Sequence, residues 1–298
     1  MASPCRVRID GVSENDRDAA HAAERAAAEV RRIESKYSRY RADSVLSRVN
    51  AAAGSGVPVA VDEETDHLLG FAAQLHEASG GLFDITSGVL RRAWDFRATH
   101  PPEASAIESV LALIGWQHVI RTPGKVALPV AGMELDLGGI GKEYAADRAG
   151  TLLREAGFGH GYVNLGGDIR LLGPMCDGSP WLLGIAHPRV AGEVAAEVRL
   201  SDGALATSGD YERYIDHDGR RYCHVLDPRT GWPVHDWQSV SVIAPACLAA
   251  GALTTIAMLM GQDASHFLRE QRVSHVLVDA TGHVTRWTPD EEAVPAVR

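Results

Sequence analysis

The sequence predicts an α+β fold in which a mainly antiparallel sheet packs against helices. Residues 12–115 consist mostly of segments with helical periodicity, whereas short alternating strand patterns dominate from about residue 117 onward. These strand patterns follow one another through turn-like residues, which favours antiparallel pairing over alternating strand–helix units. The chain has no internal repeat and no low-complexity linker. We therefore expect one domain over residues 1–298, with a helix-rich N-terminal part, about 12–115, and a strand-rich C-terminal part.

The N-terminal part begins with a strand pattern at residues 6–12 and continues as helices. Polar residues typical of helix caps precede an Ala-rich helical segment at 13–37. A second helix is expected over 61–81, where the closing glycine pair suits a left-handed C-cap. A third is expected over 101–116 and starts with proline, which helices tolerate in their first turn.

The C-terminal part is expected to consist mainly of strands. One helix, over 141–157, ends at Gly157, and two more are expected over 247–261 and 263–271. The predicted strands or strand pairs cover residues 118–122, 125–130, 133–138, 162–173, 181–188, 192–203, 212–228, 238–246 and 274–288.

The composition excludes several classes of protein. Hydrophobic residues make up 45% of the chain and charged residues 23%, which rules out a disordered chain or a fibrous repeat. The formal net charge is −10 and no dense cluster of Lys and Arg occurs, so we expect no binding to nucleic acid. The cysteines at positions 5, 176, 223 and 247 form no CxxC pair, which predicts reduced thiols rather than a zinc site or a disulfide framework.

Residues 242–261 are the one stretch that invites comparison with a membrane span, because they carry no charge. The stretch opens with a strand-like pattern and contains Pro245 and Gly251, so a strand followed by a buried helix fits better than a span. The N-terminus lacks the apolar region of a signal peptide. We therefore expect a cytoplasmic protein that does not bind a membrane.

The most informative motif is the segment Leu-Asp-Leu-Gly-Gly-Ile-Gly-Lys at 135–142, which leads into a helix. A glycine-rich turn that opens a helix directs backbone N–H groups and the positive end of the helix dipole toward one spot, which suits a phosphate or pyrophosphate. Lys142 adds a positive charge in the first turn. The segment matches neither GxxxxGK[ST] nor GxGxxG. A tight strand–helix turn with an ordinary buried Asp136 is therefore the alternative interpretation.

Three further clusters are candidates for a site. The glycine pair at 166–167 lies within a strand pattern, which indicates either a bulge or the close approach of a ligand. His224 stands on a strand just before a polar turn, a suitable place for a general base near neutral pH, although a lone histidine is more often structural. Asp84, Trp94 and Phe96 combine a polar anchor with aromatic surface that suits a flat ring, with core packing as the alternative.

Taken together and in this order, these segments resemble the ApbE family of flavin transferases. The resemblance extends over nearly the whole chain and depends on several independent motifs. The matching segments are MAS at 1–3, SRY at 38–40, SVLSRVN at 44–50, GGLFDIT at 80–86, LDLGGIGKEYAAD at 135–147, YVNLGGDIR at 162–170, ATSGDYERY at 206–214, HVLDPRTGWPV at 224–234 and SVIAPACLAAGALTT at 241–255.

The resemblance implies a T-fold-like, ApbE-like fold and an FAD:protein FMN transferase. Such enzymes split FAD at its pyrophosphate, attach FMN through a phosphoester to a Ser or Thr in a short motif of a target flavoprotein, and release AMP with the help of Mg²⁺. By this similarity His224 is the catalytic base, and the metal is bound by Thr255 and the backbone carbonyl of Gly139. The residues expected around FAD are Met1, Tyr40, Leu82, Phe83, Asp84, Asp136, Lys142 and Val225.

One position departs from the family pattern. Where the family has Ala-Asp-Ala-Leu-Ser-Thr, with a metal-binding Asp four residues before the Thr, this chain has Gly251 at the position of that Asp. Either another carboxylate, such as Asp227 or Asp136, reaches the ion, or the chain binds FAD with weak or no turnover. A Mg-dependent FAD pyrophosphatase, which uses water in place of a protein hydroxyl, is a further alternative.

Overall fold

The computed structural model describes residues 4–289, which form two compact units built from discontinuous segments. Unit 1 comprises the described residues of Met1–Glu34, Ile140–Tyr211 and Asp236–Arg298, and unit 2 comprises Ser35–Gly139 and Glu212–His235. Helix α1 (Arg17–Tyr37) begins in unit 1 and ends in unit 2. The expectation of one domain over residues 1–298 stays a prediction.

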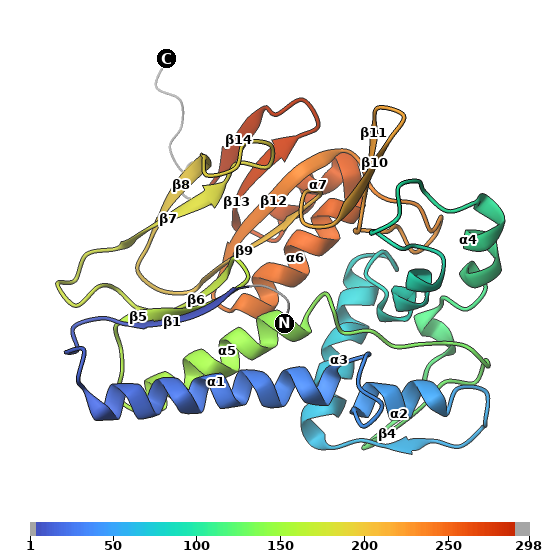
Figure 1. The fold of residues 1–298 in the computed structure, drawn as a ribbon, viewed down its shortest axis with the longest axis horizontal. Coiled ribbons are helices and arrows are strands. Elements are labelled where there is room, and N and C mark those ends of the chain that lie inside the picture. Colours follow the sequence, from blue (N-terminus) through green and yellow to red (C-terminus); the bar gives the residue numbers. More distant parts are fainter. Residues whose placement is uncertain (1–3, 290–298) are drawn as a thin grey trace. The chain divides into compact units, whose positions relative to one another are not determined.

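Unit 1 is built on a seven-stranded sheet in which every neighbouring pair is antiparallel (Figure 1). The predicted α+β class with a mainly antiparallel sheet is thereby confirmed. In spatial order the strands are β1 (Cys5–Ile9), β5 (Gly161–Leu165), β6 (Asp168–Gly173), β9 (Ala204–Gly209), β12 (Trp237–Ala244), β13 (Ser274–Asp279) and β14 (Val284–Trp287).

Helices α5 (Gly141–Glu155) and α6 (Cys247–Met260) pack against each other and against one face of this sheet (Figure 1). Polar contacts fix both helices to the strands: Ser208 of β9 is hydrogen-bonded to Thr254 of α6 at 2.8 Å, and Asp168 of β6 pairs with a lysine of α5. After α6 the chain continues through η3 (Gly261–Asp263) into α7 (Ala264–Glu270). The two helices thus bring residues that are about 100 positions apart into direct contact.

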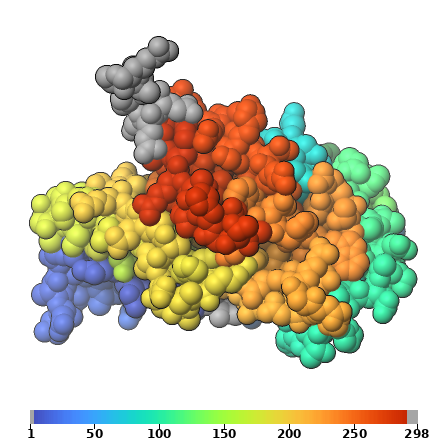
Figure 2. Space-filling model, turned by 90° about the horizontal axis from the view of Figure 1, so that it is seen from above, coloured from blue at the N-terminus to red at the C-terminus, as the bar shows by residue number. Residues whose placement is uncertain are grey.

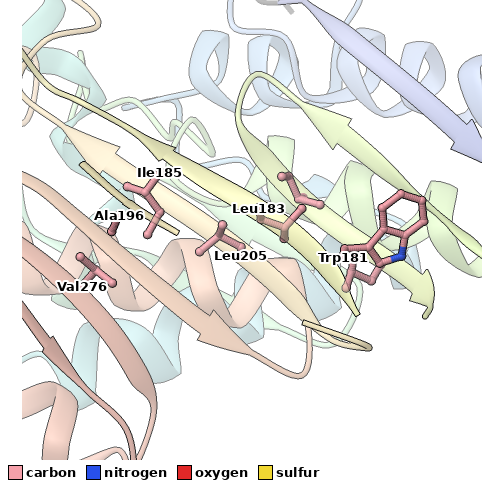
Figure 3. Close-up of a cluster of buried hydrophobic side chains, with 8 residues drawn as sticks. Trp181, Leu183, Ile185, Ala196, Leu205 and Val276 are labelled. Carbon is pink, nitrogen blue, oxygen red and sulfur yellow. The ribbon is translucent and has the colours of Figure 1, made fainter. Parts of the chain in front are cut away.

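Strands β7 (Trp181–Ala186) and β8 (Val194–Leu200) form a separate hairpin. Its side chains form a core with those side chains of the seven-stranded sheet that point away from α5 and α6. Figure 3 shows the six labelled members of this core, which come from β7, β8, β9 and β13. The indole N–H of Trp181 donates to the carbonyl of Gly173 at 2.9 Å, so the one polar atom of this large side chain is satisfied. The core consists of Ile169, Leu171, Trp181, Leu183, Ile185, Ala196, Leu205 and Val276.

The outer side of this hairpin lies at the surface beside β14, as Figure 2 shows for the yellow and red residues. A hollow there is lined by residues of β7 and β8 and by Arg286 of β14. None of the residues that the sequence analysis assigns to a site lines it.

Unit 2 combines short helices with two small sheets. Its helical segments are α2 (Val45–Ala51), α3 (Glu63–Ala78), η1 (Ile85–Arg92), α4 (Ala104–Leu111) and η2 (Trp116–His118). One sheet has the order β2 (Val59–Ala60), β4 (Lys125–Ala127) and β3 (Ile120–Thr122), and the other pairs β10 (Tyr214–His217) with β11 (Arg220–Cys223).

Trp94 belongs to a hydrophobic core cluster of unit 2. Its ring stacks on Phe96 at a centroid distance of 5.5 Å, and its indole N–H donates to the carbonyl of Gly231 at 2.8 Å. Trp94 is buried, so the core-packing interpretation holds for this residue. Around it pack Val89, Leu90, Ile107, Val110 and Ile215.

The strand predicted at 133–138 does not form. The backbone groups of Leu135 bond to the side-chain amide of Asn50, which accepts from its N–H at 2.7 Å and donates to its carbonyl at 3.0 Å. The N–H of Asp136 donates to the carbonyl of Ile85 at 2.8 Å. Because these partners replace a neighbouring strand, the segment belongs to no sheet.

The glycine pair at 166–167 forms the turn of the β5–β6 hairpin rather than a bulge within a strand. Leu165 and Asp168 are directly paired across the hairpin, and Gly166 and Gly167 have φ values of 63° and 97°. A two-residue hairpin turn of this kind needs positive φ at both positions, which glycine adopts without a steric cost. The pair is therefore explained by the local backbone.

The uncharged stretch at 242–261 forms the end of β12 and helix α6, so the prediction of a strand followed by a helix is confirmed. Among the described residues, the continuous helical run Cys247–Glu270 is the one segment whose length and apolar character would suffice to cross a membrane. More than half of its most apolar window is buried inside the fold, and core helices of soluble proteins meet the same criteria.

Candidate functional site

The residues that the sequence analysis assigns to a site are distributed over both units. Unit 1 carries Lys142 and Thr255, together with the departure at Gly251. Met1 lies outside the described residues. Unit 2 carries Tyr40, Leu82, Phe83, Asp84, Asp136, Gly139, His224 and Val225.

In unit 1 the glycine-rich turn leads directly into α5, as predicted. The residue before the helix, Ile140, provides no side-chain cap. The first N–H groups of a helix have no partners within it, so an uncapped start of a 15-residue helix can hold an anionic group. Phosphate binding at this turn stays a prediction.

Lys142 is engaged in a buried charge cluster at the first turn of α5. Its Nζ lies 2.6 Å from Oδ2 of Asp168 and 3.9 Å from Oε1 of Glu143. Burial lowers the pKa of Lys142, but the neighbouring Asp168 and Glu143 carboxylates outweigh burial and hold the pKa above its ordinary value. The ammonium group is therefore charged and held on the sheet by Asp168.

Glu143, the neighbour of Lys142, is not among the site residues predicted from the sequence. It is 6% exposed, and its Oε2 atom is buried without a hydrogen-bond partner. Burial, together with the charge of Asp168, raises the pKa of Glu143 to about 8. A signal for it exists in the sequence: Glu143 shares the i, i+3, i+7 spacing of the buried face of α5 with Ala146 and Gly150.

On α6, Gly251 is buried and Thr255 is half-buried one turn further on. Residues four apart lie on the same face of a helix, so Thr255 and position 251 share a face. The adjacent Thr254 faces the sheet, where it is hydrogen-bonded to Ser208.

In unit 2, Asp84 acts as the N-cap of η1. Its Oδ1 accepts from the N–H of Thr86 at 2.7 Å and from the hydroxyl of Thr86 at 2.6 Å, and its Oδ2 accepts from the N–H of Trp116 at 2.9 Å. The preceding Leu82 and Phe83 are buried. Asp84 therefore caps η1, and contact of these three consecutive residues with FAD stays a prediction.

Asp136 is ion-paired with Arg39, a residue of the SRY motif at 38–40 that is not among the predicted site residues. Oδ1 of Asp136 also accepts from the N–H of Gly138 at 2.9 Å. Tyr40 is 78% exposed; Arg39 donates to its hydroxyl at 3.0 Å and lies over its ring. Burial lowers the pKa of Arg39, yet Asp136 outweighs this effect and raises it.

His224 follows the last residue of β11 and is half-buried. The backbone N–H of His224 donates to the backbone carbonyl of Arg213 at 3.0 Å. The backbone carbonyl of Val225 accepts from the backbone N–H of Val234 at 3.1 Å. The turn after it is closed by Asp227, whose carboxylate pairs with Arg229 at 2.7 Å. Asp227 and Asp136, the two alternatives for a missing metal ligand, are therefore both already paired with arginines.

A comparison with protein-family models identifies the family of this chain. The model described as the ApbE family matches residues 1–278, which is nearly the whole chain. This chain belongs to the ApbE family.

Individual ApbE proteins agree with this assignment. The chain is 35% identical to an FAD:protein FMN transferase of Treponema pallidum, over 88% of this chain and 77% of the relative. It is 32% identical to an FAD:protein FMN transferase of Vibrio cholerae, over 83% of this chain and 75% of the relative. In structure it resembles an ApbE protein of Thermotoga maritima, with a TM-score of 0.86, 31% identity and coverage of 97% and 99%. The flavin transferase ApbE of Vibrio cholerae matches with a TM-score of 0.83, 27% identity and coverage of 98% and 96%.

The side chains of unit 1 fit the magnesium ion that ApbE membership implies. Mg²⁺ prefers oxygen ligands and commonly takes only one or two carboxylates, the rest being water and substrate phosphate. Accordingly, it does not require a large acidic cluster, and within residues 4–289 no group of three or more His, Cys, Asp or Glu side chains is placed to hold a metal. The donors that suit the ion are the unpartnered Oε2 of Glu143 and the hydroxyl of Thr255.

Proposed function

We propose that this chain transfers FMN from FAD to a Ser or Thr hydroxyl of a target flavoprotein, forming a phosphoester and releasing AMP. The observation that carries the proposal is the match of the ApbE family model over residues 1–278, together with relatives at 35% and 32% identity that are named FAD:protein FMN transferase. The acceptor is expected to present its hydroxyl in a short sequence motif. Cytoplasmic localisation and the absence of membrane and nucleic-acid partners remain part of the proposal.

In this proposal the two ends of FAD meet different chemistry. The uncapped start of α5 and the charge of Lys142 hold the pyrophosphate, because backbone N–H groups and an ammonium both favour an anion. The flavin ring is bound beside Tyr40, the exposed aromatic side chain of this set, and Leu82, Phe83, Asp84, Asp136 and Val225 complete the site.

The reaction exchanges a phosphoanhydride bond for a phosphoester bond. The acceptor hydroxyl oxygen forms a bond to the phosphorus of the FMN half, and the bond from this phosphorus to the bridging oxygen of AMP breaks. His224 takes the proton of the attacking hydroxyl, the role of a general base. Magnesium, when bound by Thr255 and Gly139, supplies charge neutralisation on the transferring phosphoryl group.

The proposal is tested by incubating the chain with FAD and Mg²⁺, with and without a peptide that carries the acceptor motif. We expect AMP by chromatography and a peptide heavier by one FMN less one water by mass spectrometry. AMP without peptide modification would support an FAD pyrophosphatase instead. FAD binding without either product would mean that the chain is a flavin-binding protein with no turnover.

The assignment of His224 as the base predicts a selective loss. His224→Ala should lower the transfer rate roughly 10²–10⁴-fold and leave the affinity for FAD nearly unchanged, because a base acts on the acceptor proton rather than on FAD. His266→Ala is a matched control, since His266 is an exposed helix residue paired with Glu270. An equal loss of FAD affinity in His224→Ala would show that His224 positions the ligand and is not the base.

A further inference from the structure

Gly251 stands in the interior of α6 without a backbone reason for glycine. It lies four residues into the helix and is not among the glycines with positive φ. Glycine in the middle of a helix is less favourable than alanine, so helix formation does not select it. The reason for glycine must therefore be space.

The space at position 251 is occupied by Glu143 of α5. A Cβ atom built on Gly251 would overlap the Glu143 Cγ and lie 3.0 Å from its Cδ and 3.2 Å from its Oε1. The overlap with Cγ is closer than real Cβ contacts, and the other two distances are tighter than nearly all of them, so Glu143, which is buried, would have to shift. Any side chain at 251 thus excludes Glu143 from its present position, and the two residues depend on each other.

Burial of the Glu143 carboxylate beside Gly251 has a free-energy cost that the neighbouring groups do not offset. Its Oε2 is buried without a hydrogen-bond partner, and the 2% exposed carboxylate of Asp168 lies nearby. One ammonium, Lys142, faces these two carboxylates. A buried polar atom without a partner is rare in native proteins, and a bound ion is one of the groups that satisfies such an atom.

We infer that Glu143 supplies, from helix α5, the metal-binding carboxylate that position 251 of α6 lacks. Its side chain lies against the face of α6 that also carries Thr255, one turn after Gly251. A carboxylate oxygen and a hydroxyl oxygen are ligands that suit Mg²⁺. The inference rests on the proposed function for the identity of the ion, and it replaces Asp136 and Asp227 as sources of the missing carboxylate.

The reciprocal packing is tested on the metal-free chain. Gly251→Ala should lower the melting temperature by about 5 °C, because the added methyl group overpacks the contact with Glu143. In a Glu143→Ala background the same substitution should leave the melting temperature unchanged or raise it, because alanine is the better helix former. Additive effects of the two substitutions would overturn the pairing.

The metal role is tested by calorimetric titration of MgCl₂ into the chain saturated with FAD. Glu143→Gln, which keeps the shape and removes the charge, should raise the Kd for Mg²⁺ roughly tenfold or more. The double variant Glu143→Ala/Gly251→Asp returns a carboxylate to α6 and should recover most of the affinity. Glu155→Gln, at the exposed end of the same helix, is the matched control and should bind like the wild type.

The outcomes separate this inference from the proposed function. If Glu143→Gln bound Mg²⁺ with the same affinity as the wild type, the metal role of Glu143 would be overturned. The transferase proposal would still stand in that case, provided that the wild type releases AMP. A wild-type chain that binds Mg²⁺ through Glu143 yet releases no AMP would contradict the proposed function and support the inference. A wild-type chain that binds no Mg²⁺ would overturn both.

Discussion

Lys142 illustrates how a residue in a ligand-binding motif can also be necessary for the fold. Its Nζ lies 2.6 Å from Asp168, which is 2% exposed, so removing the ammonium leaves a buried carboxylate without its cation. Lys142→Met should therefore lower the free energy of unfolding by roughly 3–5 kcal/mol. The measurement is urea unfolding of the metal-free, FAD-free chain.

Two further variants complete this test of Lys142. Lys142→Met/Asp168→Asn should recover part of the lost stability, because the buried carboxylate is then neutral. Lys125→Met, at an exposed position of β4, should unfold like the wild type. If Lys142→Met were as stable as the wild type, the ion pair would not contribute to the fold, and Lys142 would serve the ligand alone.

His275 predicts a pH dependence of stability. Burial lowers the pKa of His275 below the ordinary value of 6.5, and the charge of Arg269 lowers it further. A hydrogen bond with the backbone of Val273 raises the pKa but does not cancel these two effects. The folded chain therefore takes up this proton less readily than the unfolded chain, and the stability that His275 contributes is lost as the pH falls below about 6.5. In urea unfolding between pH 5 and 8, the wild type should lose stability relative to His275→Gln toward acid pH.

The exposed His266 provides the control for this pH experiment. His266→Gln should leave the pH dependence of the wild type unchanged, since this side chain lies on the surface of α7. A difference between His275→Gln and the wild type that stays constant with pH would contradict the role of His275.

At the scale of elements, α6 is capped by a side chain from another helix. Its own N-cap residue, Ala246, provides no side-chain hydrogen bond, and Asp147 of α5 accepts from the N–H groups of Cys247 and Leu248 at 2.9 and 2.8 Å. Asp147→Ala should lower the free energy of unfolding by about 1 kcal/mol, as measured by thermal or urea unfolding. Asp147→Asn keeps an acceptor oxygen and should lose less; equal losses in both variants would argue against capping.

The helices were predictable from the sequence because their signals are local. The helix observed at Gly141–Glu155 follows from the glycine-rich start, the apolar periodicity and the glycine at 157 that ends it. The segment 133–138 has an equally clear strand pattern, yet it forms no strand because Asn50 and Ile85 take its backbone hydrogen bonds. A strand needs a partner strand, and its own residues do not determine whether one is available.

At the scale of the whole molecule, the net charge of −10 governs behaviour in solution. The charge vanishes near the sequence pI of about 5.7, and mutual repulsion between molecules vanishes with it. Light scattering at fixed protein concentration should therefore rise as the pH approaches 5.7 and fall again toward pH 8. Scattering that does not depend on pH would show that charge is not what keeps the chain dispersed.

The sequence by itself determined the fold class, most of the helices and strands, and the membership of the ApbE family. These depend on periodicity, turn residues and the order of motifs, all of which can be observed along one chain. It also determined that position 251 carries no carboxylate, but it could not show which residue fills that space.

The tertiary structure alone decided which charged groups meet. Glu143 reaches Gly251 across 108 positions of the chain, Lys142 pairs with Asp168, and Asp136 with Arg39. Such contacts arise when helices pack on a sheet or on each other, and no periodicity in either segment encodes the partner. The physical reason is that burial sets the strength of a charge interaction, and burial is a property of the packed molecule rather than of its local sequence.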